Sequence, residues 1–77
     1  MIKEIERKYN DILSLTDKMP KNIEMSKESY TKLVEECMDM KITDFTEILD
    51  KDGNPLNPFM GMKIKFNENV DKFKIML

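Results

Sequence analysis

Residues 62–77 decide the fold of this chain, and their sequence is Met-Lys-Ile-Lys-Phe-Asn-Glu-Asn-Val-Asp-Lys-Phe-Lys-Ile-Met-Leu. Two segments within them, Met62 to Phe66 and Phe73 to Leu77, send every second side chain to an apolar face. A period of two residues is typical of a strand with one buried and one wet face. We therefore predict a C-terminal β-hairpin, and its wet face should carry the lysines Lys63, Lys65, Lys72 and Lys74.

A turn-rich stretch, residues 50–58, leads into these strands. The pattern Asp-x-Asp-x-Asn that starts at Asp50 begins like a calcium-binding loop. Such a loop needs glycine at its sixth position and glutamate at its twelfth, where this chain has Pro55 and Gly61. We expect a solvated turn that holds no metal.

The amino-terminal segment, residues 1–19, is predicted to be a helix. Its apolar side chains recur at intervals of three and four residues, with Thr16 as the one polar interruption, and Pro20 ends the pattern. This stripe consists of Ile2, Ile5, Tyr9, Ile12 and Met19. Because the spacing also fits about two and a half heptads, a homodimer formed through this helix is the alternative to packing within the domain.

A short strand and a second helix are expected next. Asn22 to Met25 alternates in polarity, and Ser26 is a good N-cap for a following helix. The predicted buried stripe of that helix is Tyr30, Leu33, Val34, Cys37 and Met38. Cys37 is interpreted as a packed apolar residue and not as a reactive thiol.

The segment Thr43 to Asp50 has two interpretations. Its β-branched and aromatic residues favour a strand, whereas Asp44 followed by Glu47 resembles a capping box that starts a helix. The strand is preferred. The whole pattern predicts one α+β domain over residues 1–77, with a helix over 1–19 and a strand, helix and sheet over 22–77. In it, two helices pack on a small antiparallel sheet.

Composition excludes several classes of function. The chain has no histidine and one cysteine, and neither of its two glycines opens a helix as a phosphate-binding loop requires. We therefore expect a non-enzymatic protein without a catalytic site, cofactor or metal. The amino terminus is charged from its third residue and no apolar run approaches the roughly 20 residues of a membrane span, which predicts a cytoplasmic protein.

Acidic side chains concentrate in the middle of the chain, where residues 24–52 carry nine acidic and four basic side chains. The predicted partner-binding residues are Glu28, Glu35, Glu36, Asp39, Met40, Asp44 and Glu47. Such a surface would attract a protein with a basic surface, including one that normally binds nucleic acid. The alternative is the ordinary wet side of a helix. Methionine is unusually abundant, at eight residues in 77, which fits a flexible apolar binding patch or an irregular core.

Three stretches of residues 25–67 resemble small accessory proteins of tailed phages and prophages. They are Met-Ser-Lys-Glu-Ser-Tyr-Thr-Lys-Leu from Met25, Leu-Asp-Lys-Asp-Gly-Asn-Pro-Leu from Leu49, and Phe-Met-Gly-Met-Lys-Ile-Lys-Phe-Asn from Phe59. In that pattern a capped helix precedes an Asp-x-x-Gly-x-Pro-Leu turn and a strand. The resemblance implies an origin in a phage or mobile element, and hence a place in the host cytoplasm.

The leading hypothesis for function is a phage-encoded protein-binding module that modulates or inhibits a host or defence protein. A phage structural or assembly accessory, oligomeric in this case, is the first alternative. A small nucleic-acid-binding protein is the second, and it is not favoured because Phe66 and Phe73 belong to the core-facing side of the predicted strands, away from the lysines.

Overall fold

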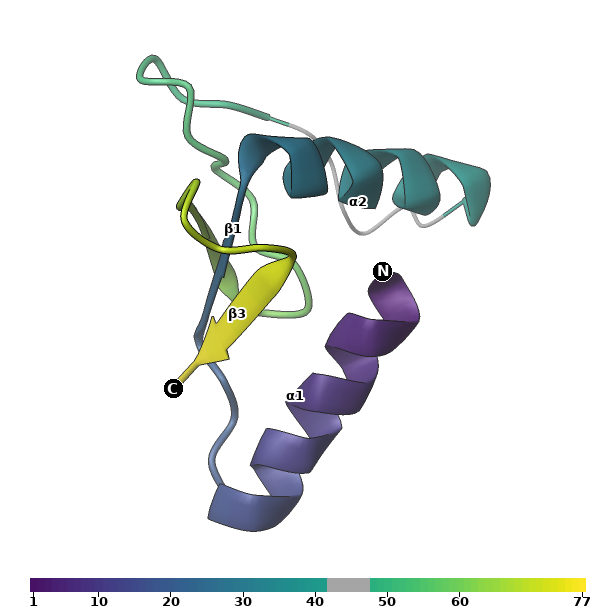
Figure 1. Ribbon diagram of the computed structural model, residues 1–77, viewed down its shortest axis with the longest axis vertical. Helices are drawn as coiled ribbons and strands as arrows, with labels where there is room; N and C mark the ends of the chain where they lie inside the picture. Colours follow the sequence, from purple (N-terminus) through teal and green to yellow (C-terminus); the bar gives the residue numbers. More distant parts are fainter. Residues whose placement is uncertain (42–47) are drawn as a thin grey trace.

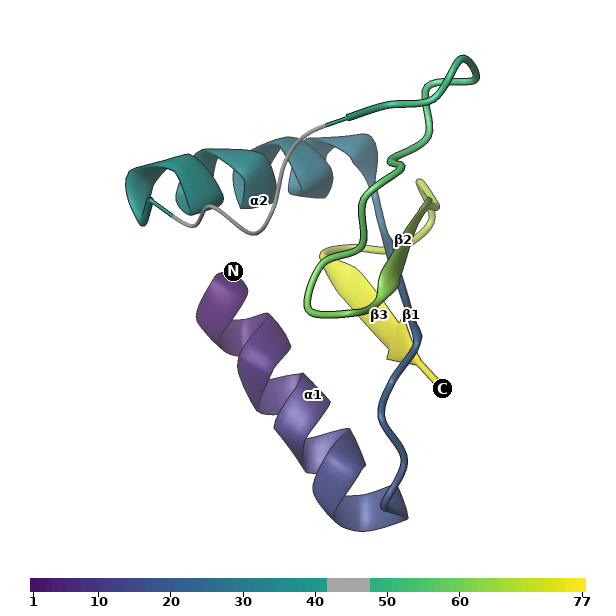
Figure 2. The same cartoon turned by 180° about the vertical axis from the view of Figure 1, so that it is seen from behind.

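The computed structural model describes residues 1–41 and 48–77. Its elements are α1 (Ile2–Thr16), β1 (Asn22–Met25), α2 (Lys27–Asp39), β2 (Lys63–Phe66) and β3 (Phe73–Met76). Both helices lie on the same side of the sheet, and the first turn of α1 points toward the middle of α2 (Figures 1 and 2). The predicted α+β class is confirmed. None of the helices in the described ranges has the length and apolarity that crossing a bilayer requires.

The sheet is mixed, which corrects the expectation of an antiparallel sheet. Its strand order is β2-β1-β3, with β1 parallel to β2 and antiparallel to β3. The two C-terminal strands therefore lie on either side of β1 and do not pair as the predicted hairpin. Residues 67–72 connect them across the end of β1, where the Asn67 amide donates to the Met25 carbonyl at 2.9 Å. A six-residue connection is long enough to cross one intervening strand.

Alternation in the three strands separates a buried face from a wet face, as predicted. The register aligns Ile23 with Ile64 of β2 and with Ile75 of β3. One residue along, Glu24 is aligned with Lys65 and Lys74 on the opposite face. Because a strand alternates sides with a period of two, the three isoleucines share the face toward the helices, whereas Met76 of β3 is aligned with Asn22 on the wet face.

Helix α1 is shorter than predicted and ends at Thr16. The residue after it, Asp17, adopts a left-handed conformation with φ of 57°, and its amide donates to the Leu13 carbonyl at 2.9 Å. This left-handed cap ends the helix before Pro20. Met19 is consequently outside the helix and 66% exposed, so its predicted place in the apolar stripe is wrong.

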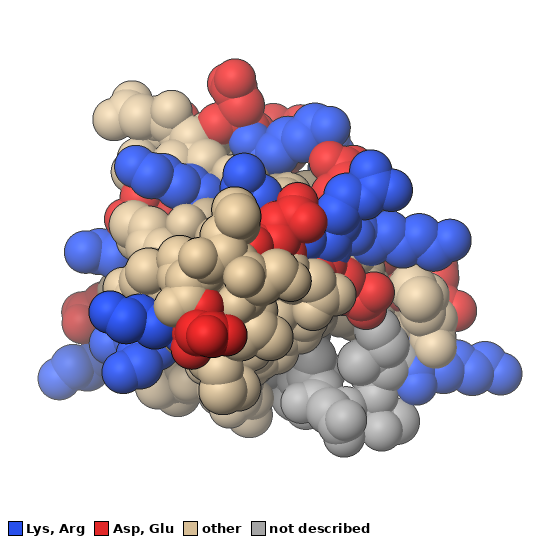
Figure 3. All heavy atoms as spheres, turned by 90° about the horizontal axis from the view of Figure 1, so that it is seen from below, with Lys and Arg blue, Asp and Glu red and all other residues tan. Residues whose placement is uncertain are grey.

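The lower end of the molecule, where α1 ends, is the face seen in Figure 3. Uncharged residues form the central area of that face, and lysines and arginines lie around much of its edge. Leu15 is 84% exposed near the end of α1. Met19 and Leu77 line a hollow of about 490 Å³ together with Lys18 and Lys21.

The second helix follows its prediction closely. The Ser26 hydroxyl accepts a hydrogen bond from the Ser29 amide at 3.1 Å, which is the expected N-cap. Leu33 and Cys37 are buried, whereas Met38 is 72% exposed and its predicted burial is wrong. Each helical residue turns by about 100°, so Met38 leaves the face on which Cys37 lies.

The core lies between the sheet and the two helices. Its buried side chains are Ile2, Ile5, Ile23, Met25, Tyr30, Leu33, Cys37, Phe59, Met62 and Ile64. Phe59 was not predicted to belong to it. Phe59 and Met62 exchange two backbone hydrogen bonds around Met60 and Gly61, whose φ values are 52° and 78°. Two consecutive positive φ values are those of a type I′ turn, which places both flanking residues in the core.

The stretch that begins at Asp50 forms a turn, as expected. The Asp50 carboxylate accepts hydrogen bonds from the amides of Asp52 and Asn54, each at 2.9 Å. Leu49 forms an isolated antiparallel bridge with Pro55. Most of the segment Thr43 to Asp50, for which a strand was preferred, lies outside the described residues.

Candidate protein-binding surface on the second helix

The exposed side of α2 carries a stripe of carboxylates. Glu28, Glu35 and Asp39 are spaced by seven and four residues, so they project from one side of the helix. Leu33 and Cys37 lie on the other side, in the core. Glu28 is 3.6 Å from the ammonium of Lys32, and both side chains are largely exposed. Such an exposed pair contributes little to stability, which leaves the stripe available to a partner.

Two methionines accompany these carboxylates at the carboxyl end of α2. Met38 is 72% exposed and Met40 is 55% exposed. The helix ends here, because the Met40 amide donates to the Glu36 carbonyl at 2.9 Å and Lys41 follows with φ of 55°. Figure 1 shows that this end of α2 extends away from the sheet.

We call Glu35, Met38, Asp39 and Met40 the acidic–methionine surface. Three of its residues, Glu35, Asp39 and Met40, are predicted partner-binding residues, and all three are exposed. Glu28 lies two turns earlier on the same stripe. The predicted residues Asp44 and Glu47 lie outside the described residues.

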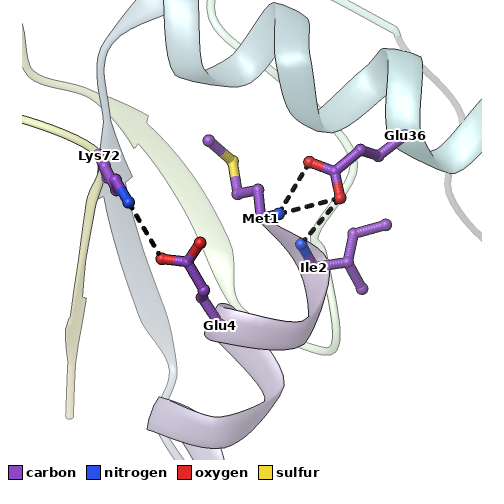
Figure 4. Close-up of polar contacts among 5 residues, drawn as sticks. All are labelled: Met1, Ile2, Glu4, Glu36 and Lys72. Atoms are coloured by element: carbon purple, nitrogen blue, oxygen red, sulfur yellow. Dashed lines mark hydrogen bonds and ion pairs between the residues drawn. The ribbon is translucent and has the colours of Figure 1, made fainter.

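Glu36 has a different role from the one expected. Its carboxylate accepts hydrogen bonds from the Met1 ammonium at 3.0 Å and from the Ile2 amide at 3.2 Å (Figure 4). It therefore joins α2 to the start of α1. An acceptor at the start of a helix satisfies an amide that has no partner within the helix and interacts favourably with the helix dipole.

The environment of Glu36 changes its pKa in two opposing directions. Burial raises the pKa, whereas the hydrogen bonds from the Met1 ammonium and the Ile2 amide, together with the ammonium charge, lower it. The lowering outweighs the effect of burial. Glu36 thus stays ionised more readily than an ordinary glutamate, and its carboxylate is hydrogen-bonded to Met1 and Ile2 of the same chain.

Cys37 lies next to Glu36 on the buried side of α2 and is 2% exposed. Burial raises the pKa of its thiol, and the negative charge of Glu36 raises it further. Because the thiolate is the reactive species, both effects oppose nucleophilic chemistry at this position. The packing predicted for Cys37 is confirmed.

A second concave region lies over the wet side of β1 and β2. It is a hollow of about 750 Å³, lined in part by Asn54, Pro55 and Leu56 of the turn-rich stretch and by Lys63 and Lys65 of β2. Glu24 also lines it and accepts a hydrogen bond from the Asn67 side-chain amide at 3.0 Å. The hollow thus mixes both signs of charge, and it brings together segments far apart in the sequence.

The wet face carries Lys63, Lys65 and Lys74, all exposed, as the alternation predicted. Lys72 lies before β3 and its ammonium is 3.3 Å from Glu4 of α1 (Figure 4). Phe66 and Phe73 are aligned with Met25 on the opposite, apolar face. The alternation therefore puts the two phenylalanines on the face opposite these lysines, although Phe66 also lines the hollow that Lys63 and Lys65 line.

Across residues 1–41 and 48–77, no three side chains among the histidines, cysteines, aspartates and glutamates gather where they could hold a metal ion. No family model, curated protein or solved structure matches this chain.

Proposed function

We propose that this chain is a non-enzymatic protein-binding module that binds a basic protein through the acidic–methionine surface of α2. The observation that carries the proposal is the exposure of Met38 and Met40, at 72% and 55%, beside two exposed carboxylates. Met38 projects from the same side of α2 as Glu35 and Asp39, and Met40, two residues later, projects from a different side at the carboxyl end of the helix. Methionine suits a binding site because its flexible, polarisable side chain adapts to different partner shapes.

The carboxylates determine what kind of partner fits. Glu35 and Asp39 are exposed and a single helical turn apart, and Glu28 extends the same stripe. Their combined field attracts a basic surface over a distance set by the ionic strength and raises the association rate. The methionines then supply apolar area once contact is made.

The resemblance to small phage proteins supports a more specific form of this proposal. In that form the partner is a host or defence protein whose basic surface normally contacts nucleic acid, and the module inhibits it by covering that surface. The module would then act in the host cytoplasm.

Affinity capture from host lysate with three versions of the protein tests the proposal. The acidic-surface variant carries Glu35→Lys and Asp39→Lys, and the control carries Lys63→Glu and Lys65→Glu on the wet face of the sheet. We expect a stoichiometric partner with wild type and with the control, but not with the acidic-surface variant. The purified partner should associate about tenfold more slowly with that variant at low salt, and the difference should shrink as salt rises.

A partner lost only with the control variant would contradict the proposal, because it would place the interaction on the wet face of the sheet. The apolar contribution is tested separately with Met38→Ser and Met40→Ser. These changes should increase the dissociation rate and leave the association rate nearly unchanged, since apolar contacts form after the encounter.

A structural or assembly accessory of a phage is the second candidate function. The observation in its favour is that both outer strands of the described sheet, β2 and β3, have only β1 as a neighbour. Strands at the edge of a sheet offer free backbone groups to another chain. Recovery of virion components in the capture experiment would favour this candidate.

A further inference from the structure

Strand β3 has a free edge whose hydrogen-bonding groups can be identified. The Lys63 amide donates to the Lys21 carbonyl and the Asn67 amide donates to the Met25 carbonyl. The backbone N–H and C=O groups of the odd-numbered residues of β1 therefore point toward β2. The backbone groups of the even-numbered residues of β1 point toward β3, where Glu24 is aligned with Lys74. Backbone groups alternate in direction along a strand. Those of Phe73, Ile75 and Leu77 consequently point away from β1.

Within the described part of the chain, no strand pairs with β3 on that outer side. Figure 1 shows β3 at the front of the molecule, with no other segment drawn across it. Its side chains are also poorly protected. Phe73, Ile75 and Met76 are only partly buried, and Leu77 beyond them is 54% exposed.

The edge strand β3 carries fewer of the charges that usually prevent association than β2 does. Lys74 is its single charged residue, whereas β2 has Lys63 and Lys65 within the same length. Lysines on an edge strand oppose pairing with another chain, and partly exposed apolar residues favour it. The two edges of this sheet thus differ, and β3 is the one suited to pairing.

We propose that two copies of this chain associate through antiparallel pairing of their β3 strands, centred on Ile75. In this register Ile75 lies opposite Ile75 of the second copy, and Phe73 lies opposite Leu77. These residues all have outward-facing backbone groups, so opposite residues exchange hydrogen bonds in the normal antiparallel pattern. The two sheets become one continuous sheet with twofold symmetry.

Charge favours the register centred on Ile75 over the alternative register centred on Lys74. Centring on Ile75 places Lys74 opposite Met76 of the second copy, so its methylene groups contact an apolar side chain. A register centred on Lys74 would place two lysines directly opposite each other, and like charges at such positions are destabilising. The pairing with the larger apolar contact is therefore also the one without charge repulsion.

The first helix adds to the interface. α1 contacts β3, and a twofold axis perpendicular to the sheet keeps the helices of both copies on one face. Leu15, near the end of α1, and Met19, just beyond it, are 84% and 66% exposed. The α1 helices of the two copies would approach each other there. This proposal does not depend on the acidic–methionine surface of α2.

Sedimentation equilibrium from about 1 µM to about 1 mM tests the proposal, because a four-residue strand pair is a small interface and gives a weak dimer. The matched variants are Met76→Glu, which places a carboxylate opposite Lys74 of the second copy, and Met76→Lys, which places an ammonium there. We expect the first to lower the dissociation constant of the dimer and the second to raise it. Each substituted pair occurs twice, so each change should be about 2-fold to about 30-fold.

Amide hydrogen exchange of the wild-type protein gives a second measurement that needs no substitution. The Ile75 amide should exchange more slowly as the protein concentration rises. The Ile64 amide, which points outward from the opposite edge of the sheet, is the control and should show no such change.

A wild-type protein that remains monomeric at about 1 mM would overturn the proposal. So would a dimer with the same dissociation constant in wild type, Met76→Glu and Met76→Lys, since the second copy would then bind another surface. Slower exchange at Ile64 with no change at Ile75 would assign the contact to β2 instead.

Discussion

The carboxylate of Glu36 lies 3.0 Å from the α-ammonium of Met1 and joins the two helices at the start of α1. These groups are 35 residues apart in sequence, and the Glu36 side chain is 36% exposed. The same carboxylate accepts a hydrogen bond from the Ile2 amide. One side chain therefore pairs with the terminal ammonium and also satisfies the first amide of α1. This contact sets where α1 begins relative to α2.

Replacing Glu36 with glutamine should destabilise the protein modestly at pH 7, by up to about 1 kcal/mol, because a partly exposed ion pair is weakened by solvent. The pKa of Glu36 is lowered in the folded state, so its contribution is fully present above the ordinary pKa of an unfolded glutamate and is lost as the pH falls through the lower pKa of the folded state. Urea unfolding of both proteins at pH 7 and pH 3 measures this. An equal difference at the two pH values would contradict the assignment.

Cys37 should be protected from thiol reagents in native buffer and should react rapidly in denaturant. It is 2% exposed, and both burial and the Glu36 charge raise the pKa of its thiol. Cys37→Ser should lower the free energy of unfolding by about 1–2 kcal/mol, since a hydroxyl replaces an apolar group in a dry site. Cys37→Ala is the matched control and should cost less, because it introduces no polar atom. Comparable labelling rates in both buffers would be inconsistent with the described packing of α2.

Helix α1 provides a matched pair of aliphatic residues for testing the core. Ile5 is completely buried, whereas Leu15 on the same helix is 84% exposed. Ile5→Ala should lower the free energy of unfolding by about 2–5 kcal/mol, and Leu15→Ala should change it by less than about 0.5 kcal/mol. Urea unfolding at micromolar protein concentration, where a weak dimer is dissociated, separates the two. Similar losses for both variants would mean that α1 is stabilised mainly by contacts between copies.

The secondary structure was predictable because its signals are local. The limits of β1 match those expected from the alternation of Asn22 to Met25, and the Ser26 cap predicted the start of α2. The end of α1 was not predictable in the same way, because Asp17 stops it through a left-handed cap that its sequence context does not require. Pro20 predicts a later stop, and the chain leaves the helix before it.

The strand order could not be predicted from these patterns. β1 is central, yet its Glu24 alternates with apolar residues as in an edge strand, and the long connection between β2 and β3 is equally compatible with a hairpin. Pairing between distant segments depends on the whole core. In the candidate site, too, some features follow from local sequence patterns and others depend on tertiary packing. The exposure of Glu35 and Asp39 follows from helical periodicity, but the contact of Glu36 with Met1 depends on how α1 meets α2.

The turn between Phe59 and Met62 should respond to substitution through backbone strain alone. Met60 and Gly61 both have positive φ, at 52° and 78°, which most side chains disfavour. Nothing lies within 4 Å of a Cβ added at Gly61, so Gly61→Ala introduces strain without a clash and should cost about 1 kcal/mol. Met60→Asn should instead stabilise the protein by up to about 1 kcal/mol, because Asn-Gly is the preferred pair for a type I′ turn. Urea unfolding of the two variants beside wild type measures both effects. A loss of stability with Met60→Asn would show that the Met60 side chain contributes more to packing than its backbone conformation costs.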